Sequence, residues 1–369
     1  MSQEQILTHL RPYCHWLLLA IPLLMPVAVW LMGYWPAPLA AALPLLVLFV
    51  LLPLADWLLG HESHNFSEAR STWVERRLLP LMCVPVQYAL VIWGVAQALS
   101  LPVATAVVWV ISMGVIGGIL AINVAHELIH RRNKLDRAAG GLLLASVNYA
   151  GFKVEHLRSH HLYVATPKDR STAQLNQSIY HFVFSALLHN PVSAWRLETR
   201  RLQRQGLPWW HPQNELLRWY AVSLALAIGL WLWLGAMAVA VFLLQGAIAA
   251  ATLEVINYIE HYGLRRRKLD NGRYEPPNER HSWNSDYFLS NALLLQLQRH
   301  ADHHANPQRP FPYLRHQPEA PQLPLGYAAM FPLALVPPLW RRVMNPRVHA
   351  LSTVDKSPRT RNNSAPSRP

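Results

Sequence analysis

The sequence predicts an all-α integral membrane protein with about six transmembrane helices and a histidine-rich region that faces the cytoplasm. Of its 369 residues, 52% are hydrophobic and only 14% are charged, a composition too apolar for an ordinary soluble domain. The net charge is +13, but the lysines and arginines flank long uncharged runs. This placement favours a lipid bilayer over nucleic acid as the partner of the positive charge, so no nucleic-acid ligand is expected.

Apolar runs long enough to cross a bilayer of about 30 Å define the expected spans. The first four runs form two pairs with very short links, and a later uncharged stretch is divided into a third hairpin by a Leu-Gly-Ala sequence at 234–236. The expected spans are residues 16–34, 37–55, 78–99, 102–122, 217–234 and 236–256.

The distribution of positive charge predicts the orientation of these spans. The three tight turns carry no lysine or arginine, whereas Arg70, Arg76 and Arg77 lie in the loop between the second and third spans. Because cytoplasmic loops are enriched in these residues, both termini are expected in the cytoplasm. The same rule places the polar stretch 123–218 and everything after Glu254 on that side.

The C-terminal part of the chain is expected to end the single domain, residues 1–351. The apolar segment Leu323–Trp340 contains four prolines, which favours an interfacial segment, with a seventh span as the weaker alternative. Residues 352–369 have too few apolar side chains to offset the entropy of ordering, so a disordered tail is expected there.

Only two cysteines occur, Cys14 and Cys83, and no CxxC pair is present. This count excludes a disulfide scaffold and a built-in iron–sulfur centre. The chemistry of the chain must therefore come from other residue types, above all from its 19 histidines.

Nine histidines gather in four segments, NVAHELIHRRN, VEHLRSHHLYVATPKD, NYIEHYG and LQRHADHHANP. His126 and His130 are four residues apart, so they share one face of a helix that is expected to continue the fourth span about 12 Å beyond the membrane core. The remaining members show three- and four-residue steps, except for one isolated histidine at the exit of the last span. They are His156, His160, His161, His261, His300, His303 and His304.

So dense a set of imidazoles indicates a metal site. Protonated imidazoles would repel one another, and buried neutral ones would leave ring nitrogens without partners. Nine donors exceed the four that a tetrahedral zinc takes, which indicates two metal ions. Since imidazole suits iron and no cysteine lies nearby, two irons that handle oxygen fit the pattern best.

Carboxylates beside these histidines are candidates for orienting the ligands or for direct chemistry. Metal-bound imidazoles commonly donate their second N–H to a carboxylate, so this is the expected role of Glu127, Asp169 and Asp286. The candidate catalytic residues are Glu155, Glu260 and Asp302, which lie next to or between histidines. Three other acids, Asp136, Glu198 and Glu215, are expected to be solvated charges near the membrane.

At these segments the chain resembles the alkane 1-monooxygenase family of membrane di-iron omega-hydroxylases, over most of residues 15–348. HELIHRR resembles the family's HELxHK box, EHLRSHH its EHxxGHH box and LQRHADHH its LQRHxxHH box, while NYIEHYG and HSWNSD also match. The resemblance implies that the nine histidines bind two non-heme irons. It implies terminal hydroxylation of linear alkanes in a bacterial inner membrane, with electrons from rubredoxin and rubredoxin reductase.

Two positions depart from the family pattern, and one motif residue has an open role. Arg131 replaces a lysine after the first box and keeps its charge, and Ser159 replaces the glycine before the paired histidines. His281, in HSWNSD, is expected to be an outer partner or a structural residue, and it is kept apart from the metal set.

Alternatives from the same and from different classes remain open. The nearest are a xylene-type methyl hydroxylase and a fatty-acyl desaturase of the same histidine-box group. A metal transporter would need polar groups at membrane depth, whereas none of the nine histidines lies in the middle of an expected span. A structural protein with zinc between its cytoplasmic loops would be distinguished by metal analysis.

Overall fold

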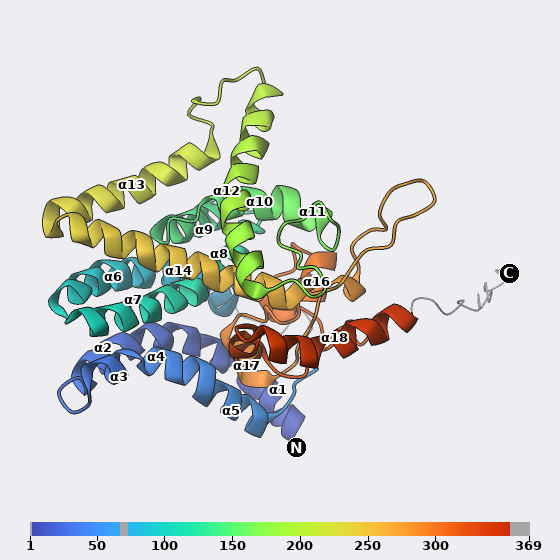
Figure 1. Cartoon of the computed structure of the whole chain (residues 1–369), viewed down its shortest axis with the longest axis horizontal. Coiled ribbons are helices and arrows are strands. Elements are labelled where there is room, and N and C mark those ends of the chain that lie inside the picture. The colour runs from blue at the N-terminus through green and yellow to red at the C-terminus, as the bar shows by residue number, and fades with distance from the viewer. Residues whose placement is uncertain (1, 67–72, 355–369) are drawn as a thin grey trace.

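The computed structural model describes residues 2–66 and 73–354, and in this part of the chain the regular structure is helical, with three isolated β-bridges (Figure 1). The α-helices are α1 (Gln3–Cys14), α2 (Leu24–Leu31), α3 (Ala37–Ala41), α4 (Leu43–Leu46), α5 (Leu52–Leu59), α6 (Leu79–Ser100), α7 (Val103–Gly117), α8 (Val124–Ile129), α9 (Lys134–Ser146), α10 (Gly151–Glu155), α11 (His161–Tyr163), α12 (Ile179–Gln203), α13 (Glu215–Leu234), α14 (Ala236–His261), α15 (Phe288–Leu293), α16 (His300–Ala305), α17 (Tyr327–Ala334) and α18 (Pro337–Val354).

Short segments of tighter or wider helix continue or link these elements. The 3-10 segments are η1 (His15–Leu23), η7 (Glu279–His281) and η8 (Phe311–Tyr313). The π segments are η2 (Val47–Leu51), η4 (Val74–Leu78), η5 (Gly118–Asn123) and η6 (His156–His160).

Within the described residues, five continuous helices are long and apolar enough to cross a membrane, which makes the chain a multi-pass membrane protein. They correspond to five of the six expected spans, although the first helix begins at Gln3, well before residue 16. Their bounds are Gln3–Leu31, Val74–Ser100, Val103–Ile129, Glu215–Leu234 and Ala236–His261.

The expected second span, residues 37–55, is broken into short pieces. Helix α3 ends at Ala41, and the following apolar helix, Leu43–Leu59, is shorter than the five spans. Pro44 stands in the first turn of this helix, where a missing N–H is tolerated, and Pro53 follows the π segment η2 inside it. The count of six spans and the cytoplasmic side of the termini therefore stay predictions.

Close packing of two spans brings the histidine-bearing ends together. A Cβ on Gly114 would lie 2.5 Å from Ile248, and one on Gly118 would lie 2.9 Å from Thr252. Only glycine permits this approach of η5 and α7 to α14, as in other membrane helix pairs. Figure 1 shows α8, α10, α11 and α16 gathered at one end of the parallel spans, with α12 standing across them.

The C-terminal segment forms two short helices. The proline-interrupted stretch is divided between α17 and the start of α18, and neither is among the helices that could span a membrane in the part of the chain described. Helix α18 continues to Val354, three residues into the expected tail. Residues 355–369, the rest of that tail, lie outside the described residues.

Candidate metal centre

The structure brings all nine predicted histidines together and divides them into two groups. In each group one ring nitrogen per histidine lies within 4.8 Å of the others. The first group contains His126, His130, His156, His161 and His303, and the second contains His160, His261, His300 and His304. Either group could hold a metal ion, and the sequence had left the division between them open.

The first two members come from the end of a helix that continues a span, as the sequence analysis expected. Helix α7 passes through the π segment η5 into α8, which carries His126 and ends at Ile129, with His130 as its C-cap residue. Both side chains enter the first group. A π turn just before a functional segment is common, because it rotates the residues that follow.

A second π turn separates neighbouring histidines. The segment His156–His160 is π-helical, and this wide turn directs His156 and His161, five residues apart, into the first group. His160, four residues after His156, joins the second group instead. The four-residue step of this segment therefore does not mark a shared ion.

Helix α16 also serves both groups. His300 and His304 are four residues apart and enter the second group, whereas His303 enters the first. This six-residue helix thus lies between the two groups. The isolated His261, at the end of α14, completes the second group.

Distances between ring nitrogens agree with coordination of a common ion. In the first group the Nε2 atom of His156 is 3.0 Å from those of His130 and His161, and the Nε2 atoms of His161 and His303 are 3.1 Å apart. In the second group Nε2 of His300 is 3.2 Å from that of His261 and 3.0 Å from that of His304. Two nitrogens bound at about 2.1 Å and at right angles lie roughly 3.0 Å apart.

Two further observations fit a metal. The buried Nε2 atoms of His126 and His160 have no hydrogen-bond partner among the described residues, although such groups are normally paired. Burial lowers the pKa of His130 to about 3, and burial also holds the pKa values of His156 and His303 well below the usual range. Neutral imidazoles with free nitrogens are the form that binds metals.

Second-group histidines are oriented by neighbouring oxygen atoms, as expected for metal ligands. The Nδ1 atom of His160 lies 3.0 Å from Oδ2 of the buried Asp169. Burial lowers the pKa of His160, but the negative charge of Asp169 more than compensates and leaves that pKa raised. Nδ1 of His261 donates to the backbone carbonyl of His281 at 3.1 Å. His281 itself belongs to neither group, as the sequence analysis assumed.

The three candidate catalytic carboxylates occupy different positions. Oε2 of Glu260 lies 3.3 Å from Nε2 of His300, so this carboxylate faces the second group. Glu155 is buried near Asp169, and burial followed by that negative charge raises its pKa to about 8. Asp302 accepts hydrogen bonds from Arg309, Asn306 and Gln317 rather than facing a histidine.

The other acids have structural partners. Glu127 accepts from Nε of Arg131 at 2.8 Å, which gives the replaced lysine position a defined role. Asp286 pairs with His316, 2.8 Å away. Asp136 and Glu198, expected to be solvated, are buried: Asp136 accepts from Arg77, and Glu198 from Arg158 and Arg201. Only Glu215 is half-buried, beside Lys153.

An apolar cavity inside the membrane-spanning part reaches both groups. Its walls come from η2, η5, α14, α15 and α17, with side chains such as Phe49, Ile119 and Leu294. It ends at His126 and His156 of the first group and at His300 of the second. A long apolar molecule could therefore lie with one end against both groups.

Several residues of this cavity were missed by sequence reasoning. Phe152 packs on the His156 ring, with centroids 4.8 Å apart, and Tyr327 lines the cavity beside Glu260. Asn257 also lines the cavity and lies within the NYIEHYG segment, so the sequence indicated that it lies near the histidines. Tyr327 carried no such signal, because it lies in the segment assigned to the membrane interface.

On the opposite side, the first group approaches the protein surface. An open hollow there is lined by His130, His161 and three arginines, Arg131, Arg132 and Arg137, and no acidic side chain lines it in the described part of the chain. His130 and His161 are only partly buried, whereas every member of the second group is buried.

Comparisons with known proteins agree with this geometry. The fatty acid desaturase family model matches residues 98–334. The chain is 44% identical over 350 residues to alkane 1-monooxygenase 1 of Pseudomonas aeruginosa, covering 92% of each protein. It is 48% identical over 277 residues to alkane 1-monooxygenase 2 of the same species, covering 74% of each. Similarity also extends to the xylene/toluene monooxygenase hydroxylase component of Pseudomonas putida, at 33% identity over 311 residues, or 84% of this chain and 81% of that one.

Proposed function

The chain belongs to the alkane 1-monooxygenase family, and we propose that it hydroxylates the terminal methyl group of linear alkanes at two non-heme irons. One oxygen atom of O₂ enters a C–H bond and gives the primary alcohol. The other oxygen leaves as water, which consumes two electrons and two protons. The chain is thus an oxidoreductase that acts on a substrate dissolved in the membrane.

The observation that carries this proposal is an apolar cavity that ends against two groups of histidines. A linear alkane offers no polar group for recognition, so binding rests on burial of its methylenes, each contributing about 0.8 kcal/mol. Because the cavity lies among the spans, an alkane can enter from the hydrocarbon core without crossing water. Which carbon meets the histidines then depends on how far the chain slides in.

The metal ligands in this proposal are the two histidine groups. His126, His130, His156, His161 and His303 hold one iron, and His160, His261, His300 and His304 hold the other. When bound, such an iron pair supplies oxygen activation and hydrogen abstraction. Asp169 and the carbonyl of His281 orient His160 and His261.

The surrounding side chains control water and protons. Phe152, packed on His156, covers the cavity end with an apolar ring and keeps water from the reacting methyl. Glu260 lies at the same end, with its carboxylate beside His300. In that position Glu260 holds a proton at a carboxyl oxygen within reach of the site. Glu155, near Asp169, and Asp302, paired with Arg309, position the segments that carry the histidines.

The electrons come from rubredoxin and its reductase in this proposal. The chain has no CxxC pair for a redox centre of its own, which supports an external carrier. The membrane is the bacterial inner membrane, with both termini and the histidines on the cytoplasmic side. The arginines of the second and later polar loops support that orientation.

Product analysis tests the proposal directly. Membranes that contain the protein are given octane, p-xylene or a fatty-acyl substrate, together with rubredoxin, its reductase and NADH, and the products are identified. We expect 1-octanol. Methylbenzyl alcohol alone would favour a xylene-type hydroxylase, in line with the similarity to the xylene/toluene enzyme. A new double bond alone would favour a desaturase.

Metal analysis tests the cofactor separately. Protein purified under mild conditions is expected to contain two irons per chain. Zinc without iron, in protein that yields no oxidised product, would contradict the oxygenase proposal and favour a structural zinc site.

A further inference from the structure

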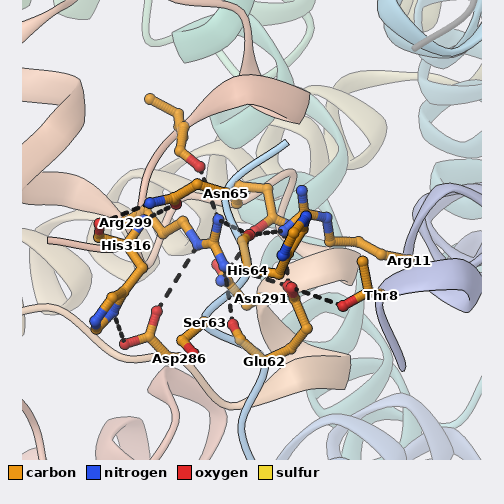
Figure 2. Close-up of polar contacts among 12 residues, drawn as sticks. Thr8, Arg11, Glu62, Ser63, His64, Asn65, Asp286, Asn291, Arg299 and His316 are labelled. Atoms are coloured by element: carbon orange, nitrogen blue, oxygen red, sulfur yellow. Dashed lines mark hydrogen bonds and ion pairs between the residues drawn. The ribbon is translucent and has the colours of Figure 1, made fainter. Parts of the chain in front are cut away.

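Two buried arginines share one carboxylate next to the helix that serves both histidine groups. Figure 2 shows Arg11, Glu62 and Arg299 meeting at this point, with Asp286 and His316 beside them. The side chains of all three central residues are almost completely buried. None of these residues belongs to the metal groups, and no step of the proposed reaction uses them.

Arg299 is the N-cap residue of α16, directly before the helix. Its carbonyl accepts the backbone N–H of Asp302 at 3.2 Å and that of His303 at 3.3 Å. The helix it starts has six residues, of which three are histidines of the two groups. So short a helix has little stability of its own, so its direction depends on tertiary contacts.

The Arg299 guanidinium fixes this end of α16 to two distant segments. It donates to the carbonyl oxygen and the carboxylate of Glu62 at 2.8 and 3.2 Å, and to the carbonyl of His64 at 3.2 Å. It also donates to the carbonyl of Leu314 at 2.8 Å. The planar fork of arginine makes these contacts directional.

Glu62 is held in turn by the N-terminal span. Nη1 of Arg11 donates to Oε2 of Glu62 at 2.7 Å, and Thr8 donates to Oε1 at 3.3 Å. The backbone N–H of Glu62 donates to the carbonyl of Asp286 at 2.9 Å. The chain α1, Glu62, Arg299, α16 is therefore continuous and buried.

Burying such charges costs desolvation energy, so the cluster is poor evidence for stability alone. Buried ion pairs are better attested as devices that fix one arrangement. We propose that Glu62 is a positioning residue of the metal centre: anchored by Arg11, it holds Arg299 and thereby the direction in which α16 presents its histidines. This inference rests on the proposed function only for the identity of the metal.

The test compares iron release and helix protection in Glu62→Gln with the wild type. Glu62→Gln keeps the side-chain size but removes the carboxylate that the two arginines share, leaving Arg299 with Asp286, 3.8 Å away, as its remaining acidic partner. In purified wild-type protein, the second group is fully buried and should release its iron to a chelator in a slow phase. We expect that phase to become roughly tenfold faster, the size seen when residues behind metal ligands are changed. Hydrogen exchange of residues 299–306 should also become faster in protein stripped of metal.

Three further variants separate positioning from loss of stability. Asp136→Asn removes another buried carboxylate–arginine contact, between α9 and η4, and should lower thermal stability without changing the slow phase. Glu62→Asp keeps the charge and should restore most of the slow release. Arg11→Met combined with Glu62→Gln relieves the repulsion between the arginines, so it should recover thermal stability while iron release stays fast.

The inference is overturned if Glu62→Gln retains wild-type iron release and wild-type exchange at α16. It is also overturned if Asp136→Asn accelerates release equally, or if the double variant restores slow release along with stability. Exchange in metal-free protein reports on α16 whatever ion the site takes. Failure of this inference is thus distinct from failure of the wild type to produce 1-octanol, which would contradict the proposed function.

Discussion

The two histidine groups are built from the same side chain but differ in their surroundings. The second group is wholly buried, and two of its four histidines, His160 and His261, are oriented by an oxygen at the ring nitrogen that faces away from the group, from Asp169 and the carbonyl of His281. The first group has five histidines, two of them partly exposed at a hollow lined by arginines. Oxygen atoms orient histidines of the second group, whereas the first group is accessible from the surface.

The two groups therefore differ in what can reach them. The cavity touches both groups, so a molecule that fills it meets both groups rather than one. Solvent can approach the first group from the surface, through the hollow that His130 and His161 line. The second group is fully buried and is reached from the cavity through His300.

The strongest test of the two groups uses adjacent residues. His303→Ala and His304→Ala remove ligands from different groups, and each is expected to lower bound iron and to abolish alkane hydroxylation, because both irons are needed. The same loss is expected for His126→Ala and His160→Ala. Iron content by elemental analysis and product yield are the measurements. His211→Ala and His349→Ala, outside both groups, should leave both quantities unchanged, and equal losses there would refute the ligand assignment.

A smaller effect is expected at a residue that orients a ligand. Asp169→Asn keeps the size of the side chain but removes the negative charge that faces His160, so hydroxylation and iron affinity should fall about 10- to 100-fold. Glu127→Gln, at a carboxylate paired with Arg131 rather than with a histidine, serves as the matched control. Equal losses of iron affinity in the two variants would contradict the inference that Asp169 orients a ligand of the second group.

Chelation should separate the groups by accessibility. A hydrophilic chelator reaches His130 and His161 from the surface, so iron should leave in two phases, with the first group emptied severalfold faster. His130→Ala, which removes a first-group ligand, should alter the fast phase and leave the slow one. A single phase for the wild type would contradict the difference in exposure.

The smallest expected effect is on the stability of metal-free protein as the pH is lowered. Burial holds the pKa of His130 at about 3, whereas the unfolded chain binds a proton there near pH 6.5. Protons taken up only by the unfolded state favour unfolding, so stability is unaffected above that pH and falls as the pH drops from there toward 3. The apparent melting temperature of the metal-free protein should therefore decrease by several degrees in mild acid. His130→Ala should reduce this decrease, and a melting temperature that rises in acid would contradict the burial argument.

The sequence by itself determined that the chain is a membrane protein, where five of the spans lie and which nine histidines gather at one site, because these depend on local patterns. A run such as 102–122 is apolar enough to define a span whatever surrounds it. Imidazoles at such density have few uses besides metal binding. The second span was harder to predict, since prolines allow several short helices where composition alone suggests one.

Only the tertiary structure decided how the histidines divide between the two groups. The π turn at His156–His160 sends His160 away from its neighbours, and α16 lies between the groups so that His303 and His304 separate. Neither result follows from residue spacing, because a regular helix would have placed residues four apart on one face. The positions of Glu62, Arg299 and Tyr327 also depend on the tertiary structure, since their partners are distant in sequence and meet only when the chain is folded.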